Sequence, residues 1–222
     1  KNAYDCAGVS VSVNEGAPAS VSENKVTVNE DATAGCSITV TTAYNDQTFT
    51  QTYVTTYLLT ETVDEKGIIK DPYRFDTLIN KTRSIDSSYK SKDLVTFSGD
   101  FSGSSSVKQI NKTVNDALLK LFEAAEKEDF TFYGLSGNRT WETQEGIYEN
   151  EPEDSAKAGQ SEHQLGFAMD LVSSNMGYLS ESFGTTDEGK WLAANAHTYG
   201  FIILYPKGKE DITGYPYEPW HV

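Results

Sequence analysis

The stretch "KQINKTVNDALLKLFEAA", residues 108–125, is where the chain changes the spacing of its apolar side chains. Upstream, apolar and polar residues alternate, whereas here the apolar residues recur at the three- and four-residue intervals of an amphipathic helix. The apolar positions are Ile110, Val114, Ala117, Leu118, Leu121, Phe122 and Ala125. We predict a helix of about five turns that packs one face inward.

Upstream of this helix, the N-terminal part of the chain has the period-two pattern of short, half-buried strands from Val9 to about Tyr57. The apolar positions are Val9, Val11, Val13, Val26, Val28, Ile38 and Val40, each flanked by Ser, Thr or Asn. We interpret residues 1–62 as a small all-β module that acts as a spacer or adhesion unit. Its residues form no constellation that indicates chemistry.

Between the two patterns the chain is rich in Lys, Asp, Ser and Gly. It contains the turn signals "DEKG" at 64–67 and "SGDFSGSSS" at 98–106. We interpret residues 63–92 as a linker that leads into a second domain, residues 93–222. At 222 residues, one larger domain with a small accessory module is the natural expectation.

Downstream of residue 125 the chain mixes helical and strand patterns. We predict a second helix over Asp187–Tyr199, with Thr185 and Glu188 as a capping box and Gly200 at the left-handed C-terminal position. Short aromatic and aliphatic runs predict strands at 130–135, 167–172 and 201–205. The predicted fold class of this part is therefore α+β, with helices packed on a small antiparallel sheet.

Charge and hydropathy narrow the classes of function. The formal net charge is −15, and no basic cluster offsets it, so nucleic acid is not expected as a partner. The mean hydropathy is −0.50, and no apolar run reaches the roughly 18 residues of a membrane span. The chain begins at Lys1 without methionine or an apolar export segment, as expected for the mature form of an exported protein.

Two cysteines, Cys6 and Cys36, are the only ones in the chain. They are too few for a thiolate metal site, and both lie in the N-terminal region. We favour a disulfide bond between them over two unpaired thiols, although the sequence leaves both alternatives open.

Two of the three histidines lie in motifs that also contain carboxylates. "SEHQLGFAMD", residues 161–170, holds His163 and Asp170, and we expect Gly166 to mark a bend that lets both side chains converge. "TGYPYEPWHV", residues 213–222, places Glu218 three residues before His221, on a backbone that the intervening proline keeps extended.

Two imidazoles and one carboxylate are a sufficient protein set for a catalytic zinc ion, which keeps a position for water. Other divalent ions also accept this set. The remaining carboxylate, Glu218, is suited to take a proton from the attacking water and deliver it to a leaving amine.

Four ordered blocks resemble the VanY-type D-alanyl-D-alanine carboxypeptidases and their L,D-carboxypeptidase relatives, from about Asp93 to the end of the chain. The blocks are "SGNRTWETQ" (136–144), "SEHQLGFAMD" (161–170), "WLAANAHTYGFIILYP" (191–206) and "EPWH" (218–221). The resemblance implies that one zinc ion is held by His163, Asp170 and His221, with Glu218 as the catalytic base. It also implies a role in catalysis and substrate binding for Arg139, and in peptide binding for Gln144 and Ser161.

The function implied by the resemblance is removal of the C-terminal D-alanine from peptidoglycan stem peptides by zinc-activated water, outside the cytoplasmic membrane of a bacterium. Leu204 and Asn138 stand where relatives often have an arginine and an aromatic residue. The substrate therefore stays open between this activity, an L,D-carboxypeptidase and a peptidoglycan endopeptidase. A non-catalytic cell-wall-binding protein is the alternative from another class.

Overall fold

The computed structural model describes residues 10–15, 19–22, 25–28, 37–44, 47–54, 63–153 and 155–222. The chain divides into two compact units, Lys1–Thr60 and Glu61–Val222. Cys6 and Cys36, for which a disulfide bond is predicted, lie outside the described residues. Within the described residues, no helix combines the length and the apolar character required to span a bilayer.

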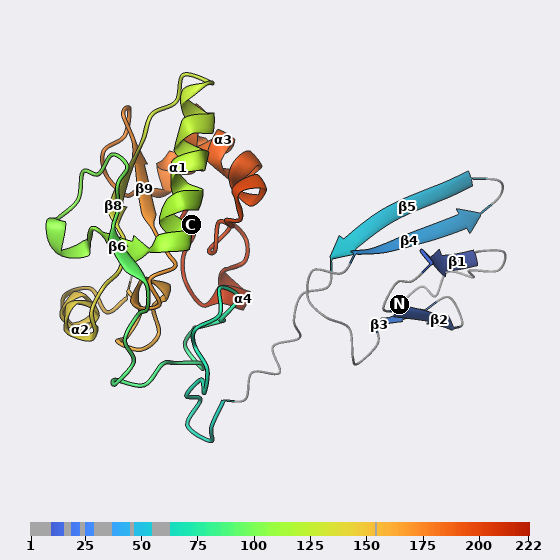
Figure 1. Ribbon diagram of the computed structural model, residues 1–222, viewed down its shortest axis with the longest axis horizontal. Coiled ribbons are helices and arrows are strands. Elements are labelled where there is room, and N and C mark those ends of the chain that lie inside the picture. Colours follow the sequence, from blue (N-terminus) through green and yellow to red (C-terminus); the bar gives the residue numbers. More distant parts are fainter. Residues whose placement is uncertain are drawn as a thin grey trace. The chain divides into compact units, whose positions relative to one another are not determined.

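The described part of the first unit consists of short antiparallel strands (Figure 1). Strands β1 (Ser10–Val13), β4 (Ser37–Tyr44) and β5 (Gln47–Val54) form one sheet in the order β1-β4-β5. Strands β2 (Ala19–Ser22) and β3 (Lys25–Val28) form a separate pair. In β2 half-buried and exposed side chains alternate, as period-two patterning requires. The predicted N-terminal strands are therefore confirmed.

The second unit contains the predicted amphipathic helix, α1 (Lys112–Glu126). It begins later than its apolar pattern because residues 109–111 form strand β7 (Gln109–Asn111), which pairs with β6 (Leu94–Thr96). The Asn111 side chain then accepts a hydrogen bond of 2.9 Å from the backbone N–H of Thr113 and caps the helix.

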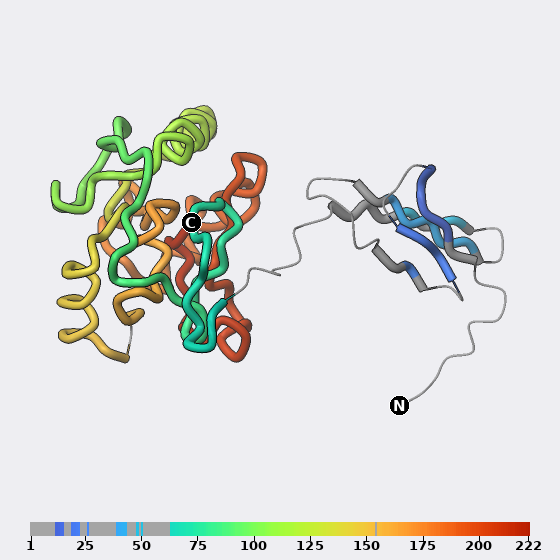
Figure 2. Tube along the Cα trace, turned by 60° about the horizontal axis from the view of Figure 1, so that its bottom comes forward, coloured from blue at the N-terminus to red at the C-terminus, as the bar shows by residue number. Residues whose placement is uncertain are grey.

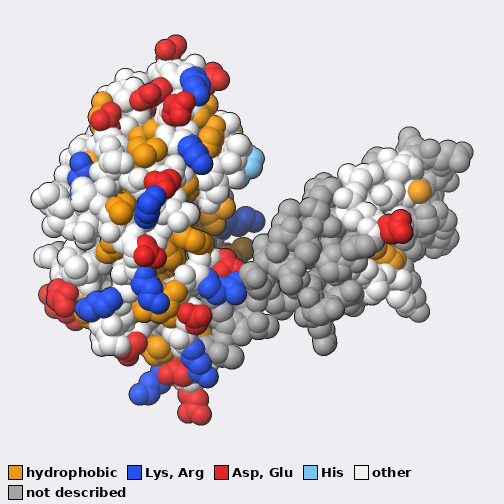
Figure 3. Space-filling view, viewed as in Figure 1, with side chains coloured by type: hydrophobic (Ala, Val, Ile, Leu, Met, Phe, Trp, Pro, Cys, Tyr) orange, Lys and Arg blue, Asp and Glu red, His pale blue; other side chains and the backbone are white. Residues whose placement is uncertain are grey.

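One face of α1 is apolar and the other is charged. The buried face contributes Val114, Leu118, Leu121, Phe122 and Ala125 to the main core. On the outer face, ion pairs at (i, i+4) spacing join Lys112 to Asp116 and Lys127 to Glu123. Figure 3 shows acidic and basic side chains interspersed over this side of the second unit. The core therefore lies between α1 and the strands behind it.

The main core is closed by strands β8 (Phe132–Ser136) and β9 (Asp170–Ser173), which pair antiparallel. Phe132 lies 6.1 Å from Phe122 and 6.4 Å from Phe183, measured between ring centroids. Both strands were predicted, and β9 begins three residues later than expected. The fold is α+β, with helices beside small antiparallel sheets, as predicted (Figure 1).

The second predicted helix is present as α3 (Asp187–Asn195), which continues as the 3-10 turn η4 (Ala196–Tyr199). It ends at Gly200, whose φ is 88°, as predicted for a left-handed C-terminal glycine. The predicted capping box is wrong by one position. Thr186, rather than Thr185, accepts a hydrogen bond of 3.0 Å from the N–H of Gly189, whereas the Thr185 hydroxyl donates to the carbonyl of Ser182.

The predicted strand at 201–205 is also wrong. Phe201 is buried and Ile202 is 63% exposed, but the run joins no named strand, and only Tyr205 makes an isolated bridge, to Glu218. The remaining elements are η1 (Ser105–Val107), α2 (Trp141–Asn150), η2 (Glu162–Gln164), η3 (Glu181–Thr185) and α4 (Glu210–Thr213).

The segment at 63–92 packs within the second unit despite its loose composition. Ile69, Ile79 and Ile85 are buried with Leu165 in a second, smaller apolar cluster. The segment also lies beside the C-terminal part of the chain (Figure 2). Lys81 Nζ lies 4.5 Å from the centroid of the Tyr215 ring, so this segment supports the loop that precedes the last residues.

Gly166→Ala is expected to lower the free energy of unfolding by about 1–2 kcal/mol, because an L-residue is strained in the left-handed region. The φ of Gly166 is 82°, and an added Cβ would lie 3.0 Å from Leu94 Cδ2. Gly177→Ala is the matched control, since an added Cβ there meets nothing within 4 Å. Urea denaturation measures both variants, and equal losses would contradict the assignment of Gly166 as an obligatory bend.

Candidate active site

Strand β9 and the last residues of the chain form the backbone frame of the site. The N–H of Met169 donates to the carbonyl of Val222 at 2.9 Å, and the N–H of Leu171 donates to that of Trp220 at 3.0 Å. These bonds place His221 directly opposite Asp170 in an antiparallel bridge. Directly opposed residues of an antiparallel pair present their side chains on the same face, so the imidazole and the carboxylate meet.

His163 reaches the same point from the turn η2, as the bend at Gly166 was predicted to allow. Its Nδ1 lies 2.8 Å from the carbonyl oxygen of Gly137 and donates to it, because a carbonyl oxygen only accepts. The unprotonated Nε2 then faces Asp170 Oδ2 at 3.3 Å. A fixed tautomer with Nε2 free is the state in which an imidazole binds a metal ion.

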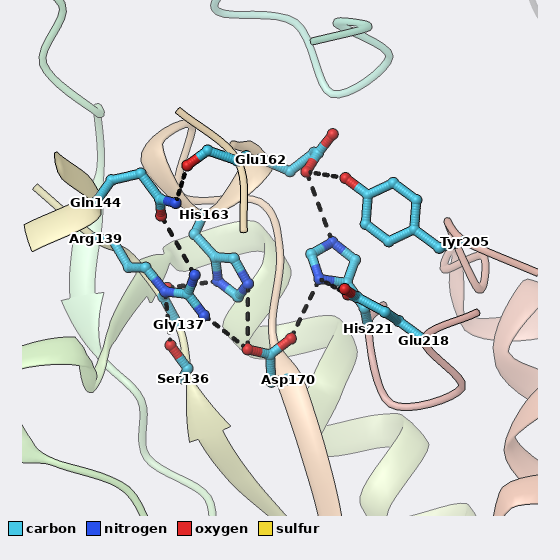
Figure 4. Close-up of polar contacts among 11 residues, drawn as sticks. Ser136, Gly137, Arg139, Gln144, Glu162, His163, Asp170, Tyr205, Glu218 and His221 are labelled. Carbon is cyan, nitrogen blue, oxygen red and sulfur yellow. Dashed lines mark hydrogen bonds and ion pairs between the residues drawn. The ribbon is translucent and has the colours of Figure 1, made fainter. Parts of the chain in front are cut away.

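His163, Asp170 and His221 form a candidate metal centre (Figure 4). All three are buried, and one ligand atom of each lies within 4.8 Å of the other two. Asp170 lies 3.3 Å from His163 Nε2 and 3.2 Å from His221 Nδ1, through different oxygens. Atoms that are each about 2.0–2.2 Å from a tetrahedral zinc ion lie about 3.3–3.6 Å apart. The two contacts of Asp170 are close to this spacing, and the donor types are those of a catalytic zinc site.

Arg139, which follows β8, is anchored beside this centre by three hydrogen bonds. Its Nη2 donates to Asp170 Oδ2 at 2.8 Å, its Nε to Ser136 Oγ at 3.0 Å and its Nη1 to Gln144 Oε1 at 3.3 Å. A guanidinium has five N–H groups, so two remain for a bound molecule.

The two candidate histidine ligands have opposite pKa shifts. Burial, together with the Arg139 guanidinium, lowers the pKa of His163 to about 4. Burial also opposes the charged form of His221, but the hydrogen bond to Asp170 and the surrounding carboxylates outweigh it and raise the pKa of His221. At neutral pH His163 is therefore uncharged, whereas the carboxylates around His221 favour its charged form.

Two glutamates flank the His221 ring on opposite sides. Glu218 Oε2 lies 3.8 Å from Nδ1, the nitrogen that faces Asp170. Glu162 Oε2 lies 3.8 Å from Nε2 and accepts a hydrogen bond of 2.8 Å from the Tyr205 hydroxyl. Burial raises the pKa of Glu218 to about 7, which suits a group that both accepts and releases a proton.

Glu162 and Tyr205 are residues that the sequence-based prediction missed. Glu162 directly precedes a predicted ligand, and Tyr205 lies within one of the four blocks, but neither position has a spacing that indicates a partner. The structure brings them together across 43 positions of sequence.

The candidate centre lies in a pocket of about 370 Å³. Ser161 and Gln144, both predicted to bind peptide, line it and are buried. The Gln144 side chain is engaged at both ends, since its Nε2 donates to the carbonyl of Ala156 at 2.7 Å and its Oε1 accepts from Arg139. Among the described residues that line the pocket, Arg139 is the only Lys or Arg.

A comparison with protein families matches residues 107–222 to the VanY model, described as D-alanyl-D-alanine carboxypeptidase. The chain is 42% identical over 172 residues to the candidate carboxypeptidase YodJ of Bacillus subtilis. That match covers 72% of this chain and 63% of YodJ, so this chain spans less than two thirds of the length of that relative.

Two solved structures are similar to this chain. The LD-carboxypeptidase LdcB matches with a TM-score of 0.67 and 41% identity, over 72% of this chain and 80% of that chain. A mutant of the D,D-pentapeptidase VanY in complex with Zn(II) matches with a TM-score of 0.54 and 28% identity, over 65% of this chain and 84% of that chain.

In the metal-free protein, the two candidate ligand histidines are expected to titrate on opposite sides of the ordinary histidine pKa. His163 should titrate near pH 4, where burial and Arg139 hold its pKa, and His221 above 6.5. NMR of the imidazole resonances against pH measures both, and the His197→Asn variant identifies the third histidine signal. A reversed order would contradict the electrostatic environment described for the site.

Proposed function

Because this chain belongs to the VanY family of D-alanyl-D-alanine carboxypeptidases, we propose that it is a zinc-dependent carboxypeptidase. Its proposed reaction is release of the C-terminal D-alanine from peptidoglycan stem peptides. The observation that carries this proposal is the convergence of His163, Asp170 and His221 in one pocket. Glu218 lies beside them, on the Nδ1 side of His221.

Zinc is the proposed metal, with one ion per chain held by His163 Nε2, Asp170 and His221 Nδ1. The donor set supports this choice, because two imidazoles, one carboxylate and an open position are typical of catalytic zinc. The similarity to a VanY structure in complex with Zn(II) also supports it. When bound, zinc would polarise the scissile carbonyl and lower the pKa of a water molecule.

Glu218 is the proposed general base. Its carboxylate faces the same side of His221 as Asp170 does, and it is close to the centre without a place in the three-ligand set. The carboxylate takes a proton from the attacking water and returns it to the leaving amine, which a pKa near 7 favours in both directions.

Arg139 is proposed to bind the substrate with the two N–H groups that its protein contacts leave available. A guanidinium donates paired hydrogen bonds to a carboxylate or to the developing oxyanion without changing its protonation. We propose that Gln144 positions this guanidinium, since its amide is already bonded to Arg139 and Ala156. Ser161 remains the proposed contact for the peptide itself.

An L,D-carboxypeptidase is the second candidate. The observation in its favour is sequence identity, which is 41% with the LD-carboxypeptidase LdcB and 28% with the D,D-pentapeptidase VanY. The family description favours the D,D activity. Both enzymes would release a terminal D-alanine, so they differ only in the residue that precedes the cleaved bond.

Peptidoglycan as substrate implies a site of action outside the cytoplasmic membrane, in the cell wall or the extracellular space. We propose residues 93–222 as the catalytic domain and residues 1–62 as a spacer or adhesion module. In this arrangement the β-rich module would hold the enzyme near its polymeric substrate.

The purified protein is expected to release one D-alanine from synthetic stem peptides, measured by mass spectrometry. A pentapeptide ending in D-Ala-D-Ala tests the D,D activity, and a tetrapeptide whose terminal D-alanine follows an L-residue tests the L,D activity. Products shortened by one alanine support the carboxypeptidase. Cleavage of cross-linked dimers into internal fragments, or no cleavage of any peptide, would contradict it.

Glu218→Gln should retain zinc and lose about 100- to 10,000-fold in kcat, the usual contribution of a general acid-base group. His221→Ala should lose the zinc itself, because it removes one of only three protein ligands. Elemental analysis and peptide hydrolysis separate the two effects, with Glu126→Gln on the exposed face of α1 as a control. Full turnover by Glu218→Gln would remove Glu218 from the mechanism.

A further inference from the structure

The two nitrogens of the His221 ring have different surroundings. Nδ1 lies 3.2 Å from Asp170 Oδ1, whereas Nε2 is buried and has no hydrogen-bond partner. The nearest charged group to Nε2 among the ion pairs of the described residues is Glu162 Oε2, at 3.8 Å. A displacement of about 1 Å would bring this pair to the distance of a charge-assisted hydrogen bond.

Glu162 is held in place for this contact (Figure 4). Its carboxylate is only 13% exposed and accepts a hydrogen bond of 2.8 Å from the Tyr205 hydroxyl. The Tyr205 ring also packs against His221, with centroids 5.0 Å apart. The backbone carbonyl of the same tyrosine accepts the N–H of Glu218 at 3.0 Å. Tyr205 is therefore held by His221 and by Glu218, and these contacts place its hydroxyl beside Glu162.

The chemistry of imidazole explains why this neighbour matters. A neutral imidazole has one protonated nitrogen and one free nitrogen, and only the free nitrogen binds a metal ion. If His221 binds through Nδ1, its proton resides on Nε2, and a buried N–H needs an acceptor. His163 meets the same requirement with its nitrogens exchanged: Nδ1 donates to the carbonyl of Gly137, and Nε2 is left free.

We propose that Glu162, oriented by the Tyr205 hydroxyl, is the positioning residue that accepts the Nε2–H of His221. It fixes the tautomer and the angle at which Nδ1 is presented to the metal ion, and it increases the basicity of the imidazole. This inference rests on the proposed function, because it concerns the same zinc site. It assigns separate tasks to the two glutamates: Glu218 acts on the reacting atoms, and Glu162 acts through His221.

Glu162→Ala is expected to weaken zinc affinity about 10- to 100-fold, the usual effect of removing a carboxylate behind a histidine ligand. Glu162→Gln keeps an acceptor oxygen and should bind zinc more tightly than Glu162→Ala. Competition with a chromophoric chelator measures the zinc affinity of each variant of the full chain without any assay of activity. Glu126→Ala, on the exposed face of α1, is the matched control and should bind zinc as the wild type does.

Tyr205→Phe should weaken zinc affinity less than Glu162→Ala, because the carboxylate remains but loses its orienting donor. The double variant Glu162→Ala/Tyr205→Phe should be no weaker than Glu162→Ala alone, because the hydroxyl acts only through Glu162. Tyr73→Phe serves as the tyrosine control. Additive losses in the double variant would contradict the chain of contacts from Tyr205 through Glu162 to His221.

NMR gives a signature that a merely structural role would not produce. In the zinc-loaded wild type the Nε2–H proton of His221 should be detected, and in Glu162→Ala it should exchange faster with water. If the wild type binds no zinc, the proposed function fails. If the wild type binds zinc and Glu162→Ala binds it equally tightly, the positioning role fails while the proposed function stands.

Discussion

The buried carboxylate of Asp170 is the constraint on which the site depends. Its side chain is 3% exposed, and an ionised carboxylate removed from water is costly unless charged or polar partners surround it. Arg139, at 2.8 Å, and His221, at 3.2 Å, meet this requirement, and the unprotonated Nε2 of His163 lies 3.3 Å from the same carboxylate. They come from the segment after β8, from η2 and from the C-terminal segment. Asp170 therefore joins distant parts of the chain at one point.

The packing of β9 explains how this polar cluster is held rigidly. Successive side chains of an extended backbone point to opposite faces, so Asp170 faces His221 while its neighbours Met169 and Leu171 face the other way. Both neighbours are fully buried in the main core with α1. A densely packed core resists displacement, so the apolar face of β9 fixes the position of the carboxylate on its polar face. The same short segment thus contributes one face to the site and the opposite face to the core.

The two nitrogens of the His221 ring have different neighbours in the pocket. Glu218 and Asp170 lie on the Nδ1 side, whereas Glu162 and Tyr205 lie on the Nε2 side. The C-terminal segment supplies both His221 and Glu218, and the bridge from Glu218 to Tyr205 connects it to the preceding loop. Glu218 and Glu162 therefore lie on different sides of one small pocket, because the imidazole ring lies between them.

The sequence alone determined the elements whose signals are local. The apolar spacing of α1, the bend at Gly166, Gly200 at the end of η4, and the motif positions of His163, Asp170, Glu218 and His221 are all set by neighbouring residues. The apolar run at 201–205 misled the prediction because it joins the C-terminal segment only at Leu204, whose N–H donates to the His221 carbonyl, and at Tyr205, which bridges to Glu218.

Only the tertiary structure decided which atoms face one another. The bridge between Asp170 and His221 turns Nδ1 of His221 toward the carboxylate, and the carbonyl of Gly137 fixes the tautomer of His163. The contact of Tyr205 with Glu162 spans 43 positions. Such contacts depend on the register between paired segments and on bends of the backbone. The spacing of residues along the chain does not determine either of these.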